Sequence, residues 1–338
     1  MDINTYEIRQ IKQINIELAG GCNLECPMCP QSGAGREKEF KKVMSFDLFK
    51  KIIDESIPFG LEFVSIAGSG EPTLSRYLAE SVRYLHARNI KSLIYTNGIS
   101  LDAALFEKLC ESGLSVLKVS CQGWDRESYS HWMSIDAYDE MRAKLLAFKA
   151  ILDSQGRFKT MLQTNHLIQD YSQVEYQKEM YLKNWINYIG GYAEIWKAHN
   201  WSGLYGNSAI SRIGISGNMP LGDKPVKRSC GRPLSEVLEI RAGGLDGHSA
   251  AVVPCPNVLG RDSEAVLGHV DKSDVYSVFN GERYKDLRKA HAEKDFDRID
   301  YCRDCDHLIS FPEALVWTNI PGRTYGESRV SGIPYVIV

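Results

Sequence analysis

Short apolar segments alternate with longer segments of helical periodicity along the first two-thirds of the chain. A short apolar run is typical of a buried strand, and apolar positions three and four apart are typical of an amphipathic helix. Regular alternation of the two predicts parallel βα units. The expected helices include residues 46–56, 74–87, 101–112 and 138–154. The expected strands lie near residues 14–19, 62–67, 91–96, 115–120, 158–164 and 192–198.

The alternation of side chains along a strand divides the fourth expected strand between two faces. Ser120 and Lys118 share one face, and Cys121 lies on the other, toward the helices. We expect Cys121, like Cys110 at the end of a helix, to pack in the core. If Lys118 and Glu17 of the first strand point inward, each is costly unless it is paired or hydrogen-bonded. We therefore predict that Glu17 and Lys118 belong to one polar network.

The composition is that of an ordinary globular chain of 338 residues, with 25% charged residues and a formal net charge of −3. This length suits one large domain or two ordinary ones. The near-neutral balance offers no basic field for nucleic acid, so we expect no nucleic-acid partner. No apolar run is long enough to span a membrane, and the polar N-terminus lacks the apolar region of a secretory signal. We expect a cytoplasmic protein without a membrane partner.

Nine cysteines stand out in a chain with these features, because disulfides are rare in the cytosol. Three of them form an early C-x3-C-x2-C group of Cys22, Cys26 and Cys29. A structural zinc site usually takes four ligands. Three thiolates instead leave one iron of a cubane iron–sulfur cluster open, since such clusters otherwise take four cysteines. An open iron can accept a chelating co-substrate.

The early cysteine group, which follows the first expected strand, resembles that of the radical S-adenosylmethionine (SAM) superfamily. In that family the cysteines hold a [4Fe–4S] cluster whose open iron is chelated by SAM, and one electron then releases a 5′-deoxyadenosyl radical that abstracts hydrogen. The resemblance implies that Cys22, Cys26 and Cys29 are cluster ligands. It departs from the family at Met28, where an aromatic residue is usual, although an adaptable methionine can also cover the adenine. A zinc knuckle that lacks one ligand is the alternative for this spacing.

Three further segments resemble the SAM-binding motifs of the family. The sequence GSGE, which contains Ser69, Gly70 and Glu71, resembles the glycine-glycine-glutamate motif that receives the amino group of SAM, with Ser69 in place of a glycine. Asn97 lies in a Thr-Asn-Gly sequence like the one that ends the third strand of the family. Ser120 ends a strand that resembles the one whose serine contacts the SAM ribose. All these residues fall at the carboxyl ends of expected strands, where parallel barrels place their active sites.

The late cysteines resemble those of the C-terminal extension called SPASM, or of its shortened form, twitch. Full SPASM domains hold two auxiliary clusters, but only four cysteines remain here. The resemblance therefore implies one fully ligated auxiliary [4Fe–4S] cluster with a role in electron transfer, and a helix over residues 275–290. A structural zinc site is the alternative, because four thiolates also suit Zn²⁺. The implied ligands are Cys230, Cys255, Cys302 and Cys305.

The resemblance implies an α/β fold, in which a partial (β/α)6 TIM-like barrel is followed by a small α+β twitch/SPASM-like domain. We expect the barrel over residues 1–202. Residues 203–228 are rich in Gly, Ser and Pro without periodicity, which predicts a linker or mobile loop. The auxiliary-cluster domain then covers 229–310. The C-terminal tail, 311–338, is apolar at its end and either docks on its own barrel or pairs with a partner.

The resemblance implies an enzyme that cleaves SAM and abstracts hydrogen from a substrate. A ribosomally synthesised precursor peptide is the favoured substrate, modified by crosslinking, epimerisation or splicing-type excision, because residues 30–40 look like those of peptide-modifying members such as the spliceases. Oxidation or decarboxylation of a sugar or aminocyclitol in natural-product biosynthesis is the alternative. A non-catalytic zinc- or cluster-binding scaffold is the alternative of another class.

Barely a dozen residues precede the first expected strand, which leaves no room for the leader-binding domain of many peptide-modifying members. We therefore expect a separate leader-binding partner protein if the substrate is a peptide, and a low-potential electron donor such as flavodoxin or ferredoxin. The candidates for acid–base contact with substrate are Glu17, Lys118 and His199. The first two are expected to point into the barrel, and His199 follows the sixth expected strand.

Overall fold

The computed structural model describes residues 1–33, 40–156, 158–203, 227–259, 264–310 and 315–321. Its centre is a single sheet in the order β10-β6-β5-β4-β3-β2-β1-β7-β8-β9. Strands β1 to β6 are parallel and follow one another across the sheet in chain order. They are β1 (Gln13–Ile16), β2 (Phe63–Ile66), β3 (Lys91–Thr96), β4 (Val116–Ser120), β5 (Met161–Ile168) and β6 (Tyr192–Lys197).

Four further strands extend the sheet at both edges. At one edge β10 pairs antiparallel with β6. At the other, β7 pairs parallel with β1, and β8 and β9 then add antiparallel. The six parallel strands therefore form an open, partial barrel, as expected. The added strands are β7 (Val237–Ile240), β8 (Ala251–Val253), β9 (Gly268–His269) and β10 (Leu315–Thr318).

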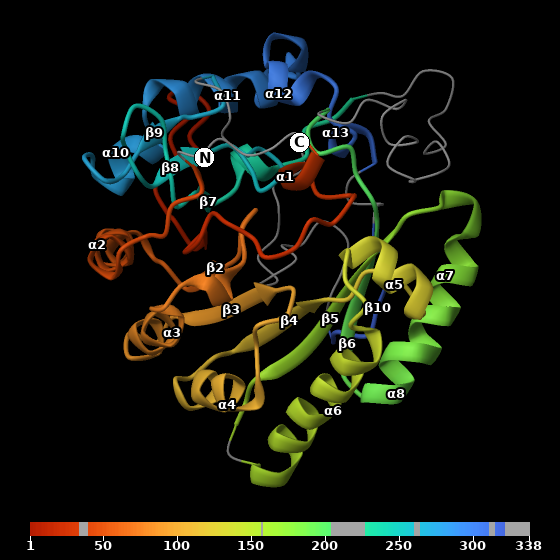
Figure 1. The fold of residues 1–338 in the computed structure, drawn as a ribbon. Coiled ribbons are helices and arrows are strands. Elements are labelled where there is room, and N and C mark those ends of the chain that lie inside the picture. Colours follow the sequence, from red (N-terminus) through yellow and green to blue (C-terminus); the bar gives the residue numbers. More distant parts are fainter. Residues whose placement is uncertain (34–39, 157, 204–226, 260–263, 311–314, 322–338) are drawn as a thin grey trace.

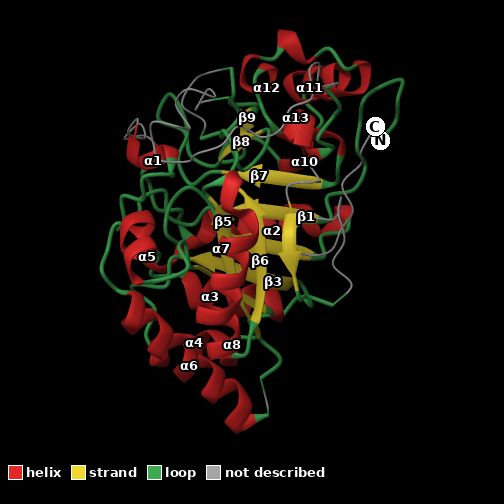
Figure 2. Ribbon diagram, turned by 90° about the vertical axis from the view of Figure 1, so that its right-hand side faces the viewer, coloured by secondary structure: helices red, strands yellow, loops and turns green. Residues whose placement is uncertain are grey.

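Helices cover the convex side of the parallel strands, and a second group surrounds β7 to β9 (Figures 1 and 2). The first group is α2 (Phe46–Ser56), α3 (Leu78–His86), α4 (Ala103–Glu111), α5 (Arg126–Met133), α6 (Tyr138–Gln155), α7 (Val174–Tyr181) and α8 (Asn187–Ile189). The second is α10 (Val275–Phe279), α11 (Glu282–Glu293), α12 (Asp300–Arg303) and α13 (His307–Ser310), and the short α1 (Pro30–Gly33) follows the early cysteines. None of the described helices is both long and apolar enough to cross a membrane.

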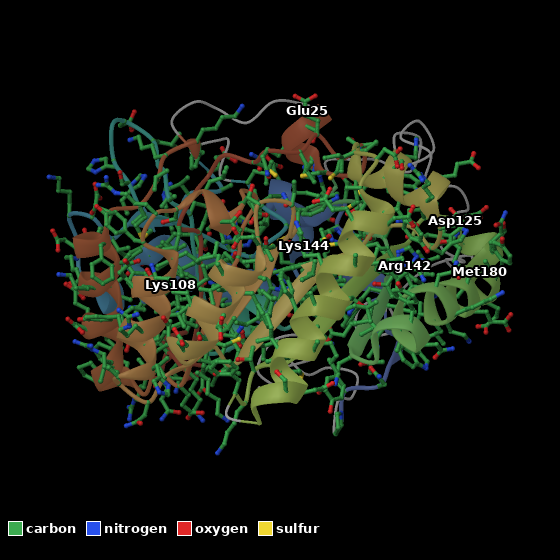
Figure 3. All side chains as sticks on the ribbon, turned by 60° about the horizontal axis from the view of Figure 1, so that its bottom comes forward. Glu25, Lys108, Asp125, Arg142, Lys144 and Met180 are labelled. Carbon is green, nitrogen blue, oxygen red and sulfur yellow. The ribbon has the colours of Figure 1, made fainter. Side chains whose placement is uncertain are left out.

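Local sequence explains where several helices begin. The side chain of Ser45 accepts a hydrogen bond from the Leu48 amide and caps α2, and Asp102 does the same for α4. The expected helix over 74–87 begins later, at Leu78, because residues 72–74 form a 3-10 turn. Helix α6 is fastened to the end of β3, since Lys144, labelled in Figure 3, donates to the Gly98 and Ile99 carbonyls.

Two further expected elements differ from the structure. The strand expected over 158–164 is instead Met161–Ile168. The single helix expected over 275–290 is broken into α10 and α11 at Asn280. The Asn280 side chain pairs with both the amide and the carbonyl of Ile8, at 2.9 and 3.1 Å, so a contact with the distant N-terminal segment competes with helix continuity.

The faces of β4 are as predicted. Leu117, Val119 and Cys121 are fully buried in the core shared with the helices. Lys118 points to the opposite side, where it lines a cavity on the concave face of the sheet. The predicted linker lies mostly outside the described residues, as does the apolar end of the tail. Within the described part of the tail, Leu315–Thr318 forms β10 on the chain's own barrel.

Candidate functional site

The early cysteine loop lies at the carboxyl end of β1. The Cys29 amide donates to the Cys26 carbonyl at 2.9 Å, which folds the loop into a tight turn. Burial, and then the nearby charges of the Cys29 and Cys22 thiols, raise the pKa of Cys26 to about 12. Burial also raises the pKa of Cys22, and thiols whose ionisation is resisted in this way fit a bound cationic centre, which would stabilise the thiolates. Glu25 of the same loop lies at the periphery in Figure 3.

Glu71 and Asn97 lie against this loop. The Asn97 side-chain amide donates to the Cys22 sulfur at 3.7 Å and to the Asn23 side chain at 2.8 Å. The buried Glu71 carboxylate accepts a hydrogen bond from the Asn97 backbone amide at 2.8 Å and another from the Thr96 hydroxyl at 2.5 Å. A negative charge is thus held rigidly beside the cysteine loop, where it can attract the amino group of a ligand.

Gly70 is required by the close approach of two loops. A Cβ atom at Gly70 would lie 1.9 Å from the Ala19 carbonyl oxygen, well inside contact distance. The neighbouring Ser69 amide donates to a Glu17 carboxylate oxygen at 3.0 Å. The GSGE segment is therefore packed directly against the residues that precede the early cysteines.

The remaining predicted SAM residues flank the same end of the sheet. Met28 is buried in a small apolar cluster with Trp132 and Ala198. The Met28 carbonyl accepts from the Trp201 indole at 2.9 Å. Ser120, at the end of β4, accepts from the Gln122 side chain at 3.0 Å. The structure therefore gathers every predicted SAM residue around the carboxyl ends of β1 to β4.

A cavity of about 160 Å³ lies on the concave face of the sheet, next to these residues. Strands of the barrel supply one side of its lining, and the loop after β6 and the segment from Arg232 to Asn257 supply the other. Its lining residues are Gln13, Asn15, Ser65, Ala67, Gly68, Leu93, Tyr95, Lys118, Leu167, His199, Trp201, Arg232, Glu239, Pro256 and Asn257.

Lys118 is buried and forms an ion pair with Glu194 of β6. Its ammonium also lies 5.3 Å from the centre of the Tyr95 ring. Glu17 accepts instead from the Ala242 amide at 3.1 Å and from the Ser69 amide. Both buried charges are compensated, but by different partners, so these contacts do not join Glu17 and Lys118 in the one polar network that was predicted. The partner of Lys118 is Glu194, which the sequence reasoning missed. A glutamate between the apolar Ala193 and Ile195 of the sixth strand was the available signal.

Two more charged residues of the cavity wall were not predicted. Glu239 of β7 accepts from Asn15 at 2.9 Å and pairs with Arg241 at 3.2 Å. Burial raises the pKa of Glu239, and the neighbouring Arg241 opposes that rise. Arg232 lines the cavity from the short turn before β7. His199, the third acid–base candidate, lies against both Trp201 and His307, with ring centres 4.4 and 5.0 Å apart.

The four late cysteines line one second cavity. Burial raises the pKa of Cys230 to about 11, and burial with neighbouring thiols raises the pKa of Cys302 and Cys305 well above the usual range. The donor set fits an iron–sulfur cluster, because four thiols from a stretch of 76 residues line one buried space. Among the described residues, no three His, Cys, Asp or Glu side chains are close enough to hold a single metal ion.

The two cavities share a wall. Arg232 and Asn257 line both of them. The loop after β6 also reaches both cysteine groups. Trp201 donates to Met28 in the early loop, and the hydroxyl of its neighbour Ser202 lies 3.9 Å from the Cys255 sulfur. Trp201 and Ser202 have left-handed backbone angles, with φ of 51° and 58°. The loop after β6 is therefore held in a conformation that non-glycine residues rarely adopt.

Comparisons with known proteins agree with this arrangement. Residues 16–180 match the family model of the radical SAM superfamily, and residues 246–306 match SPASM, an iron–sulfur cluster-binding domain. A probable GTP 3′,8-cyclase of Methanococcus maripaludis is 36% identical over 122 residues, which are 36% of this chain and 40% of that protein. An Fe-coproporphyrin III synthase of Methanosarcina barkeri is 34% identical over 102 residues, or 30% of this chain and 25% of that protein. The chain thus spans less than half the length of these curated relatives.

Solved structures share the fold over most of the chain. BtrN, in complex with AdoMet and 2-DOIA, has a TM-score of 0.59 at 18% identity and covers 92% of this chain and 99% of its own. SuiB of Streptococcus suis, bound to S-adenosylmethionine, has a TM-score of 0.61 at 17% identity and covers 89% of this chain and 71% of its own. The predicted α/β fold with a partial barrel and a C-terminal iron–sulfur domain is confirmed.

Proposed function

We propose that this chain, which carries a radical SAM domain followed by a SPASM domain, removes a hydrogen atom from a residue of a ribosomally synthesised precursor peptide held in the concave cavity. The observation that carries the proposal is the position of that cavity. It lies beside the predicted SAM residues on one side and shares Arg232 and Asn257 with the four-cysteine cavity on the other.

The cofactors are iron–sulfur clusters of the [4Fe–4S] type and SAM. Cys22, Cys26 and Cys29 would hold the SAM-binding cluster. Once bound, this cluster and SAM supply the radical chemistry that removes the hydrogen atom. Cys230, Cys255, Cys302 and Cys305 would hold the auxiliary cluster, which would supply electron-transfer chemistry beside the wall that the two cavities share.

The protein's own residues position SAM in this proposal. Glu71, fixed by its bonds to Thr96 and Asn97, holds the amino group of SAM beside the early cysteines. Gly70 and Ser69 would contact the methionine end of SAM, since Gly70 lets their segment pack against the loop that precedes the early cysteines. Met28 covers the adenine and Ser120 reaches the ribose. Each of these groups lies at the same end of the sheet, as binding by a single SAM molecule requires.

Lys118 and His199 face the cavity and would hold the substrate there. The pairing with Glu194 keeps the Lys118 ammonium in place inside the barrel. It can then donate a hydrogen bond to a carbonyl or hydroxyl oxygen of the substrate. Glu17 acts differently, because its carboxylate joins the GSGE loop to the Ala242 amide. These two hydrogen bonds hold the GSGE segment in place against the C-terminal domain.

The peptide substrate is supported by the fold shared with SuiB, whose structure bound to the precursor peptide SuiA has a TM-score of 0.54 with this chain. For a peptide substrate we also propose a separate leader-binding partner protein, and a flavodoxin or ferredoxin as the electron donor.

Oxidation of a sugar or aminocyclitol is the second candidate. The cavity wall contains several hydrogen-bonding groups, among them Asn15, Glu239 and Asn257, that suit a ligand rich in hydroxyl groups. BtrN, which was solved with 2-DOIA, matches over almost its whole length.

Anaerobic reconstitution tests the common part of both proposals. The protein should be brown, bind about eight irons in two [4Fe–4S] clusters, and release 5′-deoxyadenosine under a low-potential reductant. Replacement of Cys22, Cys26 and Cys29 by Ala should abolish this release, whereas Cys305→Ala should retain part of it. Colourless protein that contains only zinc would exclude radical SAM chemistry and leave the scaffold interpretation.

A deuterium-transfer experiment separates the two substrate classes. Deuterated precursor peptides and deuterated aminocyclitols are each incubated with the reconstituted enzyme and SAM. Transfer of deuterium into 5′-deoxyadenosine from a peptide supports the first candidate. Transfer only from a cyclitol would contradict it.

A further inference from the structure

His291 connects the second cysteine cavity to a buried hydroxyl. The residue lies on α11 and lines that cavity. Its Nε2 atom is 3.5 Å from the Cys302 sulfur, and its Nδ1 atom is 3.0 Å from the Ser229 hydroxyl oxygen. Both His291 and Ser229 are fully buried. The edge of the Phe296 ring, with ring centres 5.3 Å apart at 76°, fixes the plane of the imidazole.

The hydrogen bonds of Ser229 indicate which nitrogen of His291 carries a proton. The Ser229 oxygen already accepts from the Gly231 amide at 3.1 Å. A buried hydroxyl proton also needs an acceptor, and among the contacts of the described residues Nδ1 is in place to be that acceptor. Nδ1 then holds a lone pair and Nε2 holds the proton. The N–H bond of Nε2 consequently points at the Cys302 sulfur.

We propose that His291 donates an N–H···S hydrogen bond to Cys302 and thereby raises the reduction potential of the cluster held by the four late cysteines. The proposal rests on the proposed function, because it requires an iron–sulfur cluster at these cysteines. Reduction adds negative charge to the cluster and its sulfur ligands. A hydrogen-bond donor aimed at one sulfur stabilises that charge more in the reduced state than in the oxidised state, so the reduced state becomes easier to reach.

Ser229 has an indirect part in this arrangement. By donating to Nδ1 it selects the form of the imidazole that can donate from Nε2. Without this hydroxyl the proton can move to the other nitrogen, and the bond to Cys302 is then weakened. His291 and Ser229 are positioning residues in this sense, since they act on the cluster only through Cys302.

The test is the midpoint potential of the auxiliary cluster in the full-length, anaerobically reconstituted protein, measured by potentiometric titration with electron paramagnetic resonance. His291→Leu should shift the midpoint to a more negative value. His291→Gln should remain near the wild type, because its side-chain amide can donate from almost the same place as Nε2. Ser229→Ala should give a smaller negative shift. Replacement of His248, a partly exposed histidine of the same domain that lies beside Asp271, by Leu should give none.

The outcomes separate this inference from the proposed function. Wild-type protein that binds only one cluster, or zinc in place of the second, would overturn both. Two intact clusters and an unchanged midpoint in His291→Leu would overturn the role of His291 alone. If His291→Leu loses iron from the second site, Ser229→Ala decides, and a wild-type midpoint in that variant would overturn the inference. Formation of 5′-deoxyadenosine by each variant confirms that the first cluster is intact.

Discussion

The ion pair between Lys118 and Glu194 is the most consequential pair of residues in the barrel. Both side chains are almost completely buried, at 3% and 0% exposure. Removal of one partner leaves a charge in a poorly solvated place, which typically costs about 3–5 kcal/mol. We expect Lys118→Met and Glu194→Leu each to lower the free energy of unfolding by about that amount, and the double variant to lose less than the sum. Urea denaturation of the four proteins measures the coupling, and additive losses would contradict the pairing.

Burial lowers the pKa of His166 to about 3, which makes the stability of the fold depend on pH. The ring is fully buried, stacks on Tyr181 with centres 4.7 Å apart, and accepts from the Gly123 amide. The unfolded chain binds a proton at this residue below about pH 6.5, whereas the folded chain resists doing so until about pH 3. The stability from His166 is therefore complete above pH 6.5 and falls as the pH drops toward 3.

Protonation linked to His166 should lower the free energy of unfolding by about 1.4 kcal/mol for each unit that the pH falls within that window. We expect His166→Gln to reduce the slope of unfolding free energy against pH between pH 6.5 and 5 by that amount. Urea denaturation at pH 7, 6 and 5 gives the slopes. Replacement of the exposed His131 serves as the control, and equal slopes for wild type and His166→Gln would contradict the assignment.

The sequence motifs identified individual site residues, but they did not identify the residues with which buried charged side chains pair. The spacing of Cys22, Cys26 and Cys29 and the GSGE segment carry their meaning locally, so their placement together at one sheet end could be anticipated. The partner of Lys118 could not, since it lies 76 positions away across β5 and depends on strand register. His291 lay on a largely polar helix, with nothing nearby in the sequence to connect it to Cys302.

Among the elements, the loop after β6 joins the two cysteine groups through Trp201 and Ser202. We expect Trp201→Phe, which keeps the ring and loses the N–H donor to Met28, to weaken SAM binding about fivefold, the equivalent of a hydrogen bond worth about 1 kcal/mol. Trp201→Ala should weaken it further, because Met28 also loses an apolar neighbour. Equilibrium binding of SAM to the reconstituted protein measures both. A dissociation constant unchanged in Trp201→Phe would show that the indole N–H plays no part.

The parallel strands and their helices followed from periodicity because each is buried and apolar on a predictable face. Helices α5 and α7 were missed, since they are short and their sequences are largely polar. The break between α10 and α11 depends on Asn280 bonding to Ile8, which is 272 positions away. Local patterns therefore predict an element until a distant contact decides where it ends.

The two domains that the sequence predicts share one continuous sheet in the structure. We still propose a barrel over 1–202 and an auxiliary-cluster domain over 229–310. The sheet nevertheless continues from β1 to β7 in parallel register, with Gln13 opposite Val237. The Asn15–Glu239 bond and the Glu17–Ala242 bond cross the same boundary. Cysteine spacing indicated two cluster sites, but only the sheet order reveals that the second domain completes the edge of the first.

This continuity predicts that the two domains unfold together. Leu238 of β7 is fully buried in the main core. Leu238→Ala should therefore cost about 2–5 kcal/mol, and the loss should be reported equally from both sides of the boundary. Tryptophan fluorescence, to which the buried Trp185 contributes, reports on the barrel, and amide hydrogen exchange of α11 reports on the C-terminal domain. Val43→Ala, at a residue that is 53% exposed, should change neither. A shared sheet cannot lose the β1–β7 pairing on one side without exposing the other side. Faster exchange in α11 with an unchanged barrel transition would therefore contradict this prediction and indicate two independent folding units.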